Sequence, residues 1–164
     1  MNNCRSIFNQ IIRIEFFNVT DNSLSFSKPF VVYDPTITVS DDANDNAICT
    51  VNNEPAFVAV IDDMSASLTV DSATGLPGSK FKNVVEYEVL WGDGATDIEE
   101  YKKQLVSILH NNYHMRITYL FGSQHIVRSD AEAWSFSFKE SSGKMKITIS
   151  VENVSGAQRV VSNS

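Results

Sequence analysis

Apolar and polar residues alternate along most of this chain, which is the pattern of β-strands with one buried face. The clearest example is residues 84–91, where Val85, Tyr87, Val89 and Trp91 share one face. The intervening positions carry polar residues at Glu86 and Glu88, so we expect a strand with one side in a core and one side in water.

A strong hairpin is predicted near the end of the chain. Its first strand, residues 133–139, places Trp134, Phe136 and Phe138 on one face, and Ser141-Ser142-Gly143 makes the turn. The second strand has apolar residues at Met145, Ile147, Ile149 and Val151, which alternate with polar ones.

Weaker strand patterns fill the rest of the chain. They cover residues 11–17, 24–27, 30–33, 36–39, 47–51, 56–61, 66–70, 115–121 and 125–128. In the first of these, Ile12, Ile14 and Phe16 are expected to share a face. Pro29 and Pro35 lack backbone donors, so the segment around them belongs at a sheet edge or a bend.

One segment has the period of a helix, from Thr96 to His110. Thr96 and Glu99 have the spacing of a capping box, in which each side chain bonds a free backbone N–H of the other. An apolar stripe at helical spacing follows, made of Ile98, Tyr101, Leu105, Ile108 and Leu109. We therefore expect a surface helix that covers one face of a sheet.

These elements predict a mainly β fold, an antiparallel β-sandwich or barrel-like sheet with one flanking helix at about residues 96–110. Residues 1–152 are expected to form a single β-rich domain, with a polar C-terminal tail at 153–164 that a partner would order. A long loop, residues 71–83, lies within the domain, and loops of this length are often functional.

Composition adds two constraints. A chain of 164 residues with a net charge of −7 is not expected to bind the phosphate backbone of a nucleic acid. Cys4 and Cys49 are the only cysteines, and both are expected to be reduced thiols, since a chain of this size needs no disulfide.

The sequence also indicates where in the cell the protein is made. No apolar run approaches the length needed to span a membrane. Arg13 and Glu15 interrupt the apolar N-terminal stretch, so it does not have the layout of a secretion signal. We expect a protein made in a cytoplasm.

Four patterns in the sequence partly match known metal-binding, phosphate-binding or catalytic motifs, but none of them matches fully. His110 and His114 have zinc-ligand spacing, but the helix is expected to end between them. The acidic loop that begins at Asp41 and Asp42 places neither a glycine nor a late glutamate where an EF-hand requires them.

The other two patterns involve a loop and a strand. Gly75 and Gly78 have two residues between them instead of the four of a phosphate-binding loop, and no helix follows. Glu86 and Glu88 lie on one strand face and could form a catalytic pair, although a wet sheet face explains them as well. We therefore expect no catalytic residue, metal site or cofactor.

The layout resembles that of bacteriophage tail tube proteins and related virion proteins. The shared features are strands up to Val70, the long loop at 71–83, a long strand, the helix at 96–110 and then the last sheet strands. This resemblance implies a non-enzymatic subunit that stacks in rings around a DNA channel, in a virion assembled in the host cytoplasm. Its partners would be further copies of itself and other tail proteins, and DNA would pass an acidic lumen without specific binding.

The loop and the C-terminal segment would then reach neighbouring subunits. The expected inter-subunit contacts are Gly75, Pro77, Gly78, Lys80, Phe81, Lys82, Asn153, Gln158 and Arg159. Three alternatives remain open at this point. The first two are another tail component (terminator, connector or baseplate protein) and a carbohydrate-binding β-sandwich. The latter requires exposed aromatic residues, for which Trp91, Trp134, Tyr113 and Tyr119 are the candidates. A small enzyme built on Glu86 or Glu88 is a third.

Overall fold

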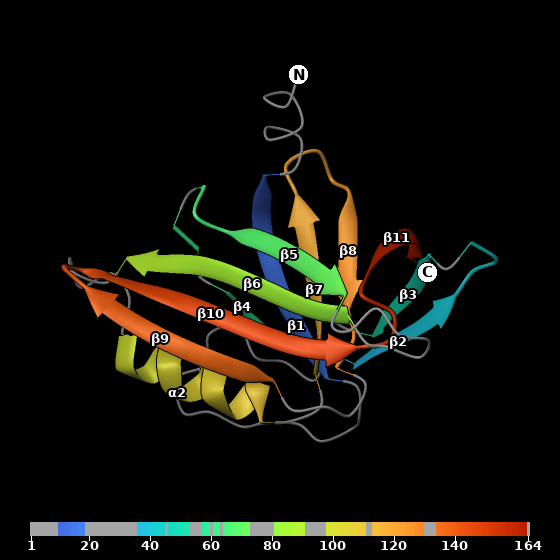
Figure 1. The fold of residues 1–164 in the computed structure, drawn as a ribbon. Coiled ribbons are helices and arrows are strands. Elements are labelled where there is room, and N and C mark those ends of the chain that lie inside the picture. The colour runs from blue at the N-terminus through green and yellow to red at the C-terminus, as the bar shows by residue number, and fades with distance from the viewer. Residues whose placement is uncertain are drawn as a thin grey trace.

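A computed structural model gives the fold of the chain, and two β-sheets and one helix make up its described part (Figure 1). The structure describes residues 10–18, 36–44, 46–52, 57–59, 61–62, 64–72, 81–90, 98–110, 113–129 and 134–163. The predicted fold class, mainly β with a sandwich or barrel-like sheet and one flanking helix, is confirmed, and the described strands form two sheets.

The larger sheet, here sheet A, has seven strands in the order β2-β3-β11-β8-β7-β1-β4. Their bounds are β1 Ile11–Asn18, β2 Thr36–Asp41, β3 Ala47–Asn52, β4 Phe57–Val58, β7 Tyr113–Tyr119, β8 Gln124–Val127 and β11 Ala157–Asn163. Most neighbours are antiparallel, but β11 pairs with β3 in parallel. The sheet curls until Asn18 at the end of β1 pairs with Thr36 of β2, and no closed barrel is formed by the described strands.

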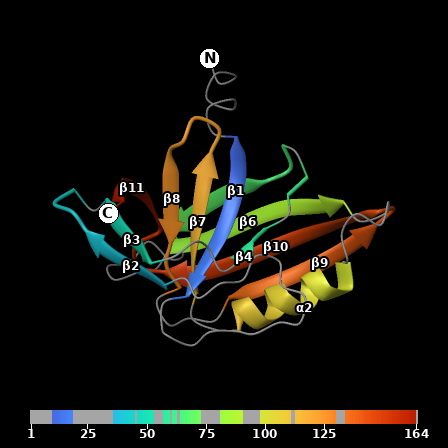
Figure 2. The ribbon, with the colours of Figure 1, turned by 180° about the vertical axis from the view of Figure 1, so that it is seen from behind.

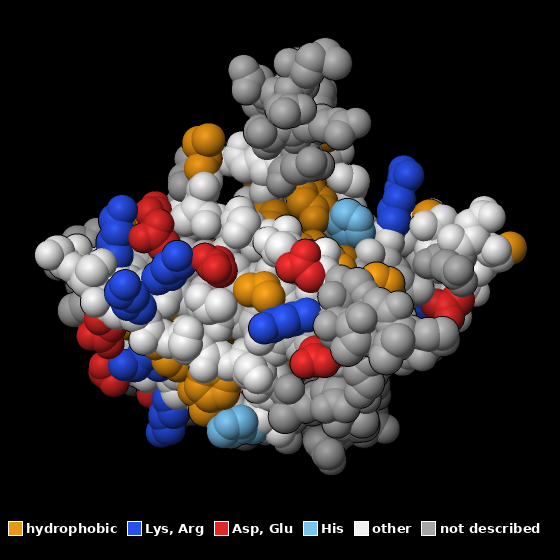
Figure 3. Space-filling view, in the orientation of Figure 1, with side chains coloured by type: hydrophobic (Ala, Val, Ile, Leu, Met, Phe, Trp, Pro, Cys, Tyr) orange, Lys and Arg blue, Asp and Glu red, His pale blue; other side chains and the backbone are white. Residues whose placement is uncertain are grey.

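The smaller sheet, sheet B, has four antiparallel strands in the order β5-β6-β10-β9. Their bounds are β5 Ser67–Ser72, β6 Phe81–Leu90, β9 Ser135–Ser141 and β10 Lys144–Asn153. The helix α2, Ile98–Leu109, lies beside β9 on the side of sheet B that faces sheet A (Figure 2). The opposite face of sheet B, called here the outer face, is turned to the viewer in Figure 3 and is mostly polar.

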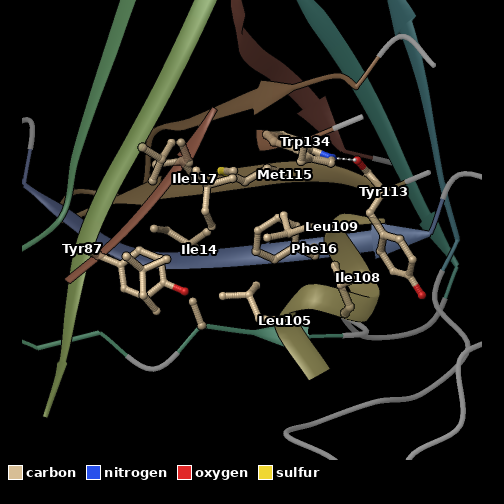
Figure 4. Close-up of a cluster of buried hydrophobic side chains, with 14 of the residues drawn as sticks. Ile14, Phe16, Tyr87, Leu105, Ile108, Leu109, Tyr113, Met115, Ile117 and Trp134 are labelled. Atoms are coloured by element: carbon tan, nitrogen blue, oxygen red, sulfur yellow. Dashed lines mark hydrogen bonds between the residues drawn. The ribbon is translucent and has the colours of Figure 1, made fainter. Parts of the chain in front are cut away.

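The main core lies between the two sheets. Ile14 and Phe16 of β1 and Met115 of β7 are fully buried against Tyr87 of sheet B and Leu105 of α2 (Figure 4). Burying a large apolar side chain contributes about 1.5–3 kcal/mol, so this layer supplies most of the driving force for packing the sheets.

Trp134 closes one end of this core. Its ring meets Phe16 edge-on, with centroids 6.1 Å apart, and its indole N–H donates to the carbonyl of Tyr113 at 3.2 Å. Hydrogen-bonding the one polar atom of the indole allows the whole ring to be buried.

The helix performs the role that its sequence pattern predicted. All five residues of the apolar stripe are buried, together with Gln104. The described helix starts at Ile98, so the predicted capping residue Thr96 lies outside the described residues. Glu99 and Glu100 occupy the first turn, where their charge is favourable for the helix dipole.

Strand β1 departs from simple alternation. The register shifts between Ile11 and Arg13, which indicates a bulge. As a result Ile11, Ile14 and Phe16 face the core and Ile12 is 48% exposed, so the prediction that Ile12 shares the buried face is wrong.

The C-terminal segment also differs from its prediction. Residues 153–164 were expected to form a polar tail, but Asn153 ends β10 and residues 157–163 form β11 inside sheet A. The strand pairs with β8 through Ala157–Arg159 and with β3 through Val160–Asn163, so its partners are within the chain itself.

Other boundaries shift by a few residues. The predicted loop 71–83 is shorter at both ends, because residues 71–72 continue β5 and residues 81–83 begin β6. The predicted strands at 24–27 and 30–33 lie outside the described residues, as do residues 73–80 of the loop.

Candidate functional site

The outer face of sheet B carries side chains of both charges among hydroxyls. Four lysines (Lys82, Lys139, Lys144 and Lys146) and four acidic residues (Asp71, Glu86, Glu88 and Glu152) occupy its outward positions on the four strands. Figure 3 shows blue and red side chains interspersed over this face. Its charge is therefore balanced, in contrast to the net charge of −7 of the whole chain.

Opposite charges on this face are paired across strands. Lys82 of β6 lies directly opposite Asp71 of β5 on one side and Glu152 of β10 on the other. Lys146 of β10 forms an ion pair with Glu86 at 3.0 Å. Glu86, one of the two carboxylates considered for catalysis, is thus held by a lysine on an exposed sheet face.

Sheet B ends in an edge strand on each side. Among the described residues, no strand pairs with the free side of β5 or of β9. Lys139 on β9 lies directly opposite another lysine, Lys146, whereas the outward charge on β5 is Asp71. One edge is therefore locally basic and the other locally acidic on the same face.

An exposed apolar group lies where β5 and β6 lead into loop 73–80. Val70 is 38% exposed and Phe81 is 39% exposed, and Val154 in the turn after β10 is 61% exposed. Gly156, at φ +65°, lies under Phe81 and Val70, because an added Cβ would be only 3.4 Å from the Phe81 ring. This backbone conformation and this close approach both favour glycine.

The predicted inter-subunit residues fall into three groups. Phe81, Lys82 and Arg159 are exposed, so an inter-subunit role for them stays a prediction. Asn153 is fully buried and Gln158 is 6% exposed, so their side chains are not on the subunit surface and the prediction is corrected for both. Gly75, Pro77, Gly78 and Lys80 lie outside the described residues.

Asn153 is instead the centre of a buried polar node at the point where the chain passes from sheet B to sheet A. Its Oδ1 accepts from the N–H of Gly156 at 2.7 Å and from Nδ2 of Asn83 at 3.0 Å. Its Nδ2 donates to the carbonyls of Arg128 at 2.8 Å and Gly156 at 3.2 Å. Such a fully used amide fixes the turn that directs β11 into sheet A.

A second polar group lies on the inner side of the curl of sheet A. Glu15 is 2% exposed, and its carboxylate accepts from Nε of Arg116 and pairs with its terminal nitrogen, both at 3.0 Å. The Arg116 guanidinium also lies 4.7 Å from the centre of the Phe17 ring. Local alternation puts Glu15 on the strand face away from Ile14 and Phe16, but it cannot show that the curl of sheet A buries this face.

Cys49 belongs to the same interior. It packs in a small apolar cluster with Phe17, Ala47 and Ile126, and it is a free thiol. Burial raises the pKa of this thiol, partly offset by the positive charges of Arg116 and Arg128. A buried thiol with a raised pKa is a poor nucleophile.

The histidines do not form a metal site together. The ring of His110, at the end of α2, contacts Phe136, with centroids 5.7 Å apart. Nδ1 of His114 in β7 accepts from the N–H of Ser129 at 3.3 Å. Over the residues that the structure describes, no group of three His, Cys, Asp or Glu side chains could hold a metal ion.

In the acidic loop after β2, the carboxylate of Asp42 holds the backbone in a turn. Oδ1 of Asp42 accepts from the N–H groups of Asn44 at 2.9 Å and Asn46 at 2.8 Å. These two bonds lower the pKa of Asp42. The local motif is therefore a turn held by an aspartate side chain.

The aromatic residues considered for carbohydrate binding are mostly internal. Trp134, Tyr113 and Tyr119 are 4%, 2% and 7% exposed, and Trp91 lies outside the described residues. A sugar-binding platform needs an exposed ring, so no described residue of this set favours that alternative.

Comparison with known proteins gives no relative, since no protein-family model, curated protein or solved structure matches the chain. Among the described residues, no helix is long and apolar enough to cross a membrane.

Proposed function

We propose that this chain is a non-enzymatic structural protein of a bacteriophage virion, specifically a tail tube subunit whose copies join into stacked rings. The observation that carries the proposal is the form of sheet B: four antiparallel strands, with an unpaired edge on each side in the described part of the chain.

The direction of the strands makes head-to-tail joining possible. Each of the four strands is antiparallel to its neighbour, so β5 and β9 at the two edges run in opposite directions. When β5 of a second copy is placed beside β9 of the first, the two strands are again antiparallel. The same contact can repeat from copy to copy, and such a heterologous contact closes into a ring when the rotation per copy fits.

Sheet A also ends in two edge strands, β2 and β4, but β2 is partly closed against β1 and β4 is short. At one end β2 reaches β1 through the Asn18–Thr36 pair, and at the other end β4 has only two residues. Exposed strand edges are a hazard that proteins cover or shorten. The two long edges of sheet B are thus the natural place for pairing between subunits.

The outer face of sheet B would line the channel. Its other face carries sheet A and α2, so the bulk of each subunit lies away from the outer face (Figure 2). A face with equal numbers of lysines and carboxylates gives DNA little gain from counterion release. The lumen we propose is therefore balanced in charge, whereas the net charge of the whole chain predicts an acidic one.

Electron microscopy of the purified chain tests the proposal. Negative-stain images and light scattering over a range of protein concentrations should show rings, and at higher concentration stacked tubes. Single rings that never stack would indicate a terminator or connector. A chain that stays strictly monomeric at high concentration would contradict the proposal.

A further inference from the structure

The geometry points to one register for the contact between subunits: β5 of one copy lies against β9 of the next, with Val70 opposite Phe138 and Asp71 diagonal to Lys139. This inference rests on the proposed function and specifies how the rings are held together. The second copy of this chain is the partner.

The register follows from strand length and from face. All six residues of β5 find a partner on β9 only when residues 67–72 face either 141–136 or 140–135. A shift of one residue moves every side chain to the other face of the sheet. Ser67 and Ser141 both lie on the outer face, whereas Glu140 lies on the inner one, so only the pairing of Ser67 with Ser141 keeps the two faces continuous.

On the inner face this register joins one apolar pair, Val70 and Phe138, and brings Leu68 opposite Glu140. It places Val70, which is 38% exposed in the single subunit, directly opposite Phe138, which is partly buried against the core. An aromatic residue opposite a β-branched one is a favourable cross-strand pair. The contact would extend the core of one subunit toward the next.

The same register joins opposite charges on the outer face. Lys139 stands opposite Thr69 and diagonal to Asp71, within reach of its long side chain. In the isolated subunit Lys139 has a like charge, Lys146, directly opposite it on β10. A carboxylate from the neighbouring copy relieves that repulsion, whereas pairing of two β9 edges would bring two more lysines together. Lys139 and Asp71 thus select the head-to-tail contact over the two-fold one.

Cysteine cross-linking tests the register. The double variant Ser67→Cys with Ser141→Cys places two thiols directly opposite each other, within the range of a disulfide. After oxidation of assembled protein it should give a covalent ladder of copies on a denaturing gel. The control Ser67→Cys with Ser137→Cys is four residues out of register and should give none. Equal cross-linking of both pairs would overturn the register.

Charge reversal tests the selection. Lys139→Glu and Asp71→Lys should each raise the concentration needed for half-assembly by about fivefold, and the double variant should restore it. Lys139→Glu also removes a like-charge contact with Lys146, so it should not destabilise the fold of the single subunit. A loss of assembly can then be assigned to the contact between subunits.

The reversal of Asp71 has a matched control. Glu152→Lys meets Lys82 in the same way as Asp71→Lys but lies on β10, away from the junction, and it should not alter assembly by more than twofold. Assembly that is insensitive to both reversals overturns this inference alone, whereas a monomeric wild-type chain overturns the proposed function with it.

Discussion

The hydroxyl oxygens of Tyr87 and Tyr101 lie 2.7 Å apart in the centre of the protein and join β6 to α2. Both side chains are fully buried. Burial, together with the neighbouring Tyr101, raises the pKa of Tyr87 well above its usual value. The helix is therefore fixed to sheet B by this buried hydrogen bond and by the Lys102–Glu140 ion pair, as well as by its apolar stripe.

Removal of the Tyr101 hydroxyl should lower the free energy of unfolding, because it takes a hydrogen-bond partner from a second buried hydroxyl. Tyr101→Phe leaves the Tyr87 hydroxyl buried without this partner, so we expect the free energy of unfolding to fall by about 1–3 kcal/mol. Urea denaturation measures it. In the double variant Tyr87→Phe, Tyr101→Phe the loss should be no larger than in Tyr101→Phe alone, and additive losses would show that the two hydroxyls act independently.

Loss of either arginine partner of Glu15 should lower the free energy of unfolding, but loss of Arg116 should lower it more than loss of Arg13. Arg116→Ala leaves the carboxylate buried, with Arg13 as its remaining cation at 3.1 Å, and we expect a loss of about 3–5 kcal/mol in unfolding free energy. Arg13 is itself 48% exposed, so Arg13→Ala should cost less than about 1 kcal/mol. Equal losses in thermal or urea unfolding would contradict the buried geometry.

The asparagine node should control the C-terminal strand. Asn153→Ala removes four hydrogen bonds at the turn before β11, and we expect the unfolding free energy to fall by about 3 kcal/mol. Hydrogen exchange should show lost protection in residues 157–163 before other strands. The neighbouring exposed change Glu152→Ala serves as a control and should stay within about 0.5 kcal/mol.

His125 should make stability depend on acidity. Burial lowers the pKa of His125 below its usual value of 6.5, and the positive charge of Arg159 lowers it further. A base with a lowered folded-state pKa contributes stability above the unfolded value of about 6.5, and this stability is lost as the pH falls through the folded pKa. We therefore expect the unfolding free energy to decrease as the pH falls below about 6.5.

Arg159→Ala tests the cause of this shift. Removing the arginine charge should raise the pKa of His125 partway toward 6.5, while burial keeps it below that value. An NMR titration of the imidazole measures it directly. Lys139→Ala, a change on the other sheet, should leave the titration unchanged.

The sequence predicted those elements whose pattern is complete within one segment. The buried stripe of α2 and the buried face of β6, with Val85, Tyr87 and Val89, were both correct. In each case the spacing of large apolar residues alone decides which side faces the core. Tertiary context had only to supply the opposite layer.

The errors arise where distant residues decide the structure. Residues 157–163 contain only Val160 and Val161 as large apolar residues, so nothing local marks a strand, and β3 and β8 supply its pairing. The burial of Asn153 has the same origin, because its partners Arg128 and Asn83 come from other parts of the chain. Polar residues that are buried by long-range contacts look like surface residues in a sequence.

The mixed pairing of β11 has a consequence for the order of folding. The hairpin of β2 and β3 is held in sheet A mainly by a strand that lies more than a hundred residues further along the chain, since Val160 pairs with Ala47. Closing so large a loop costs entropy before any contact repays it. During synthesis the hairpin must therefore wait with one side open until nearly all of the described chain has emerged, and sheet B, whose strands lie closer together in the chain, can be complete before it.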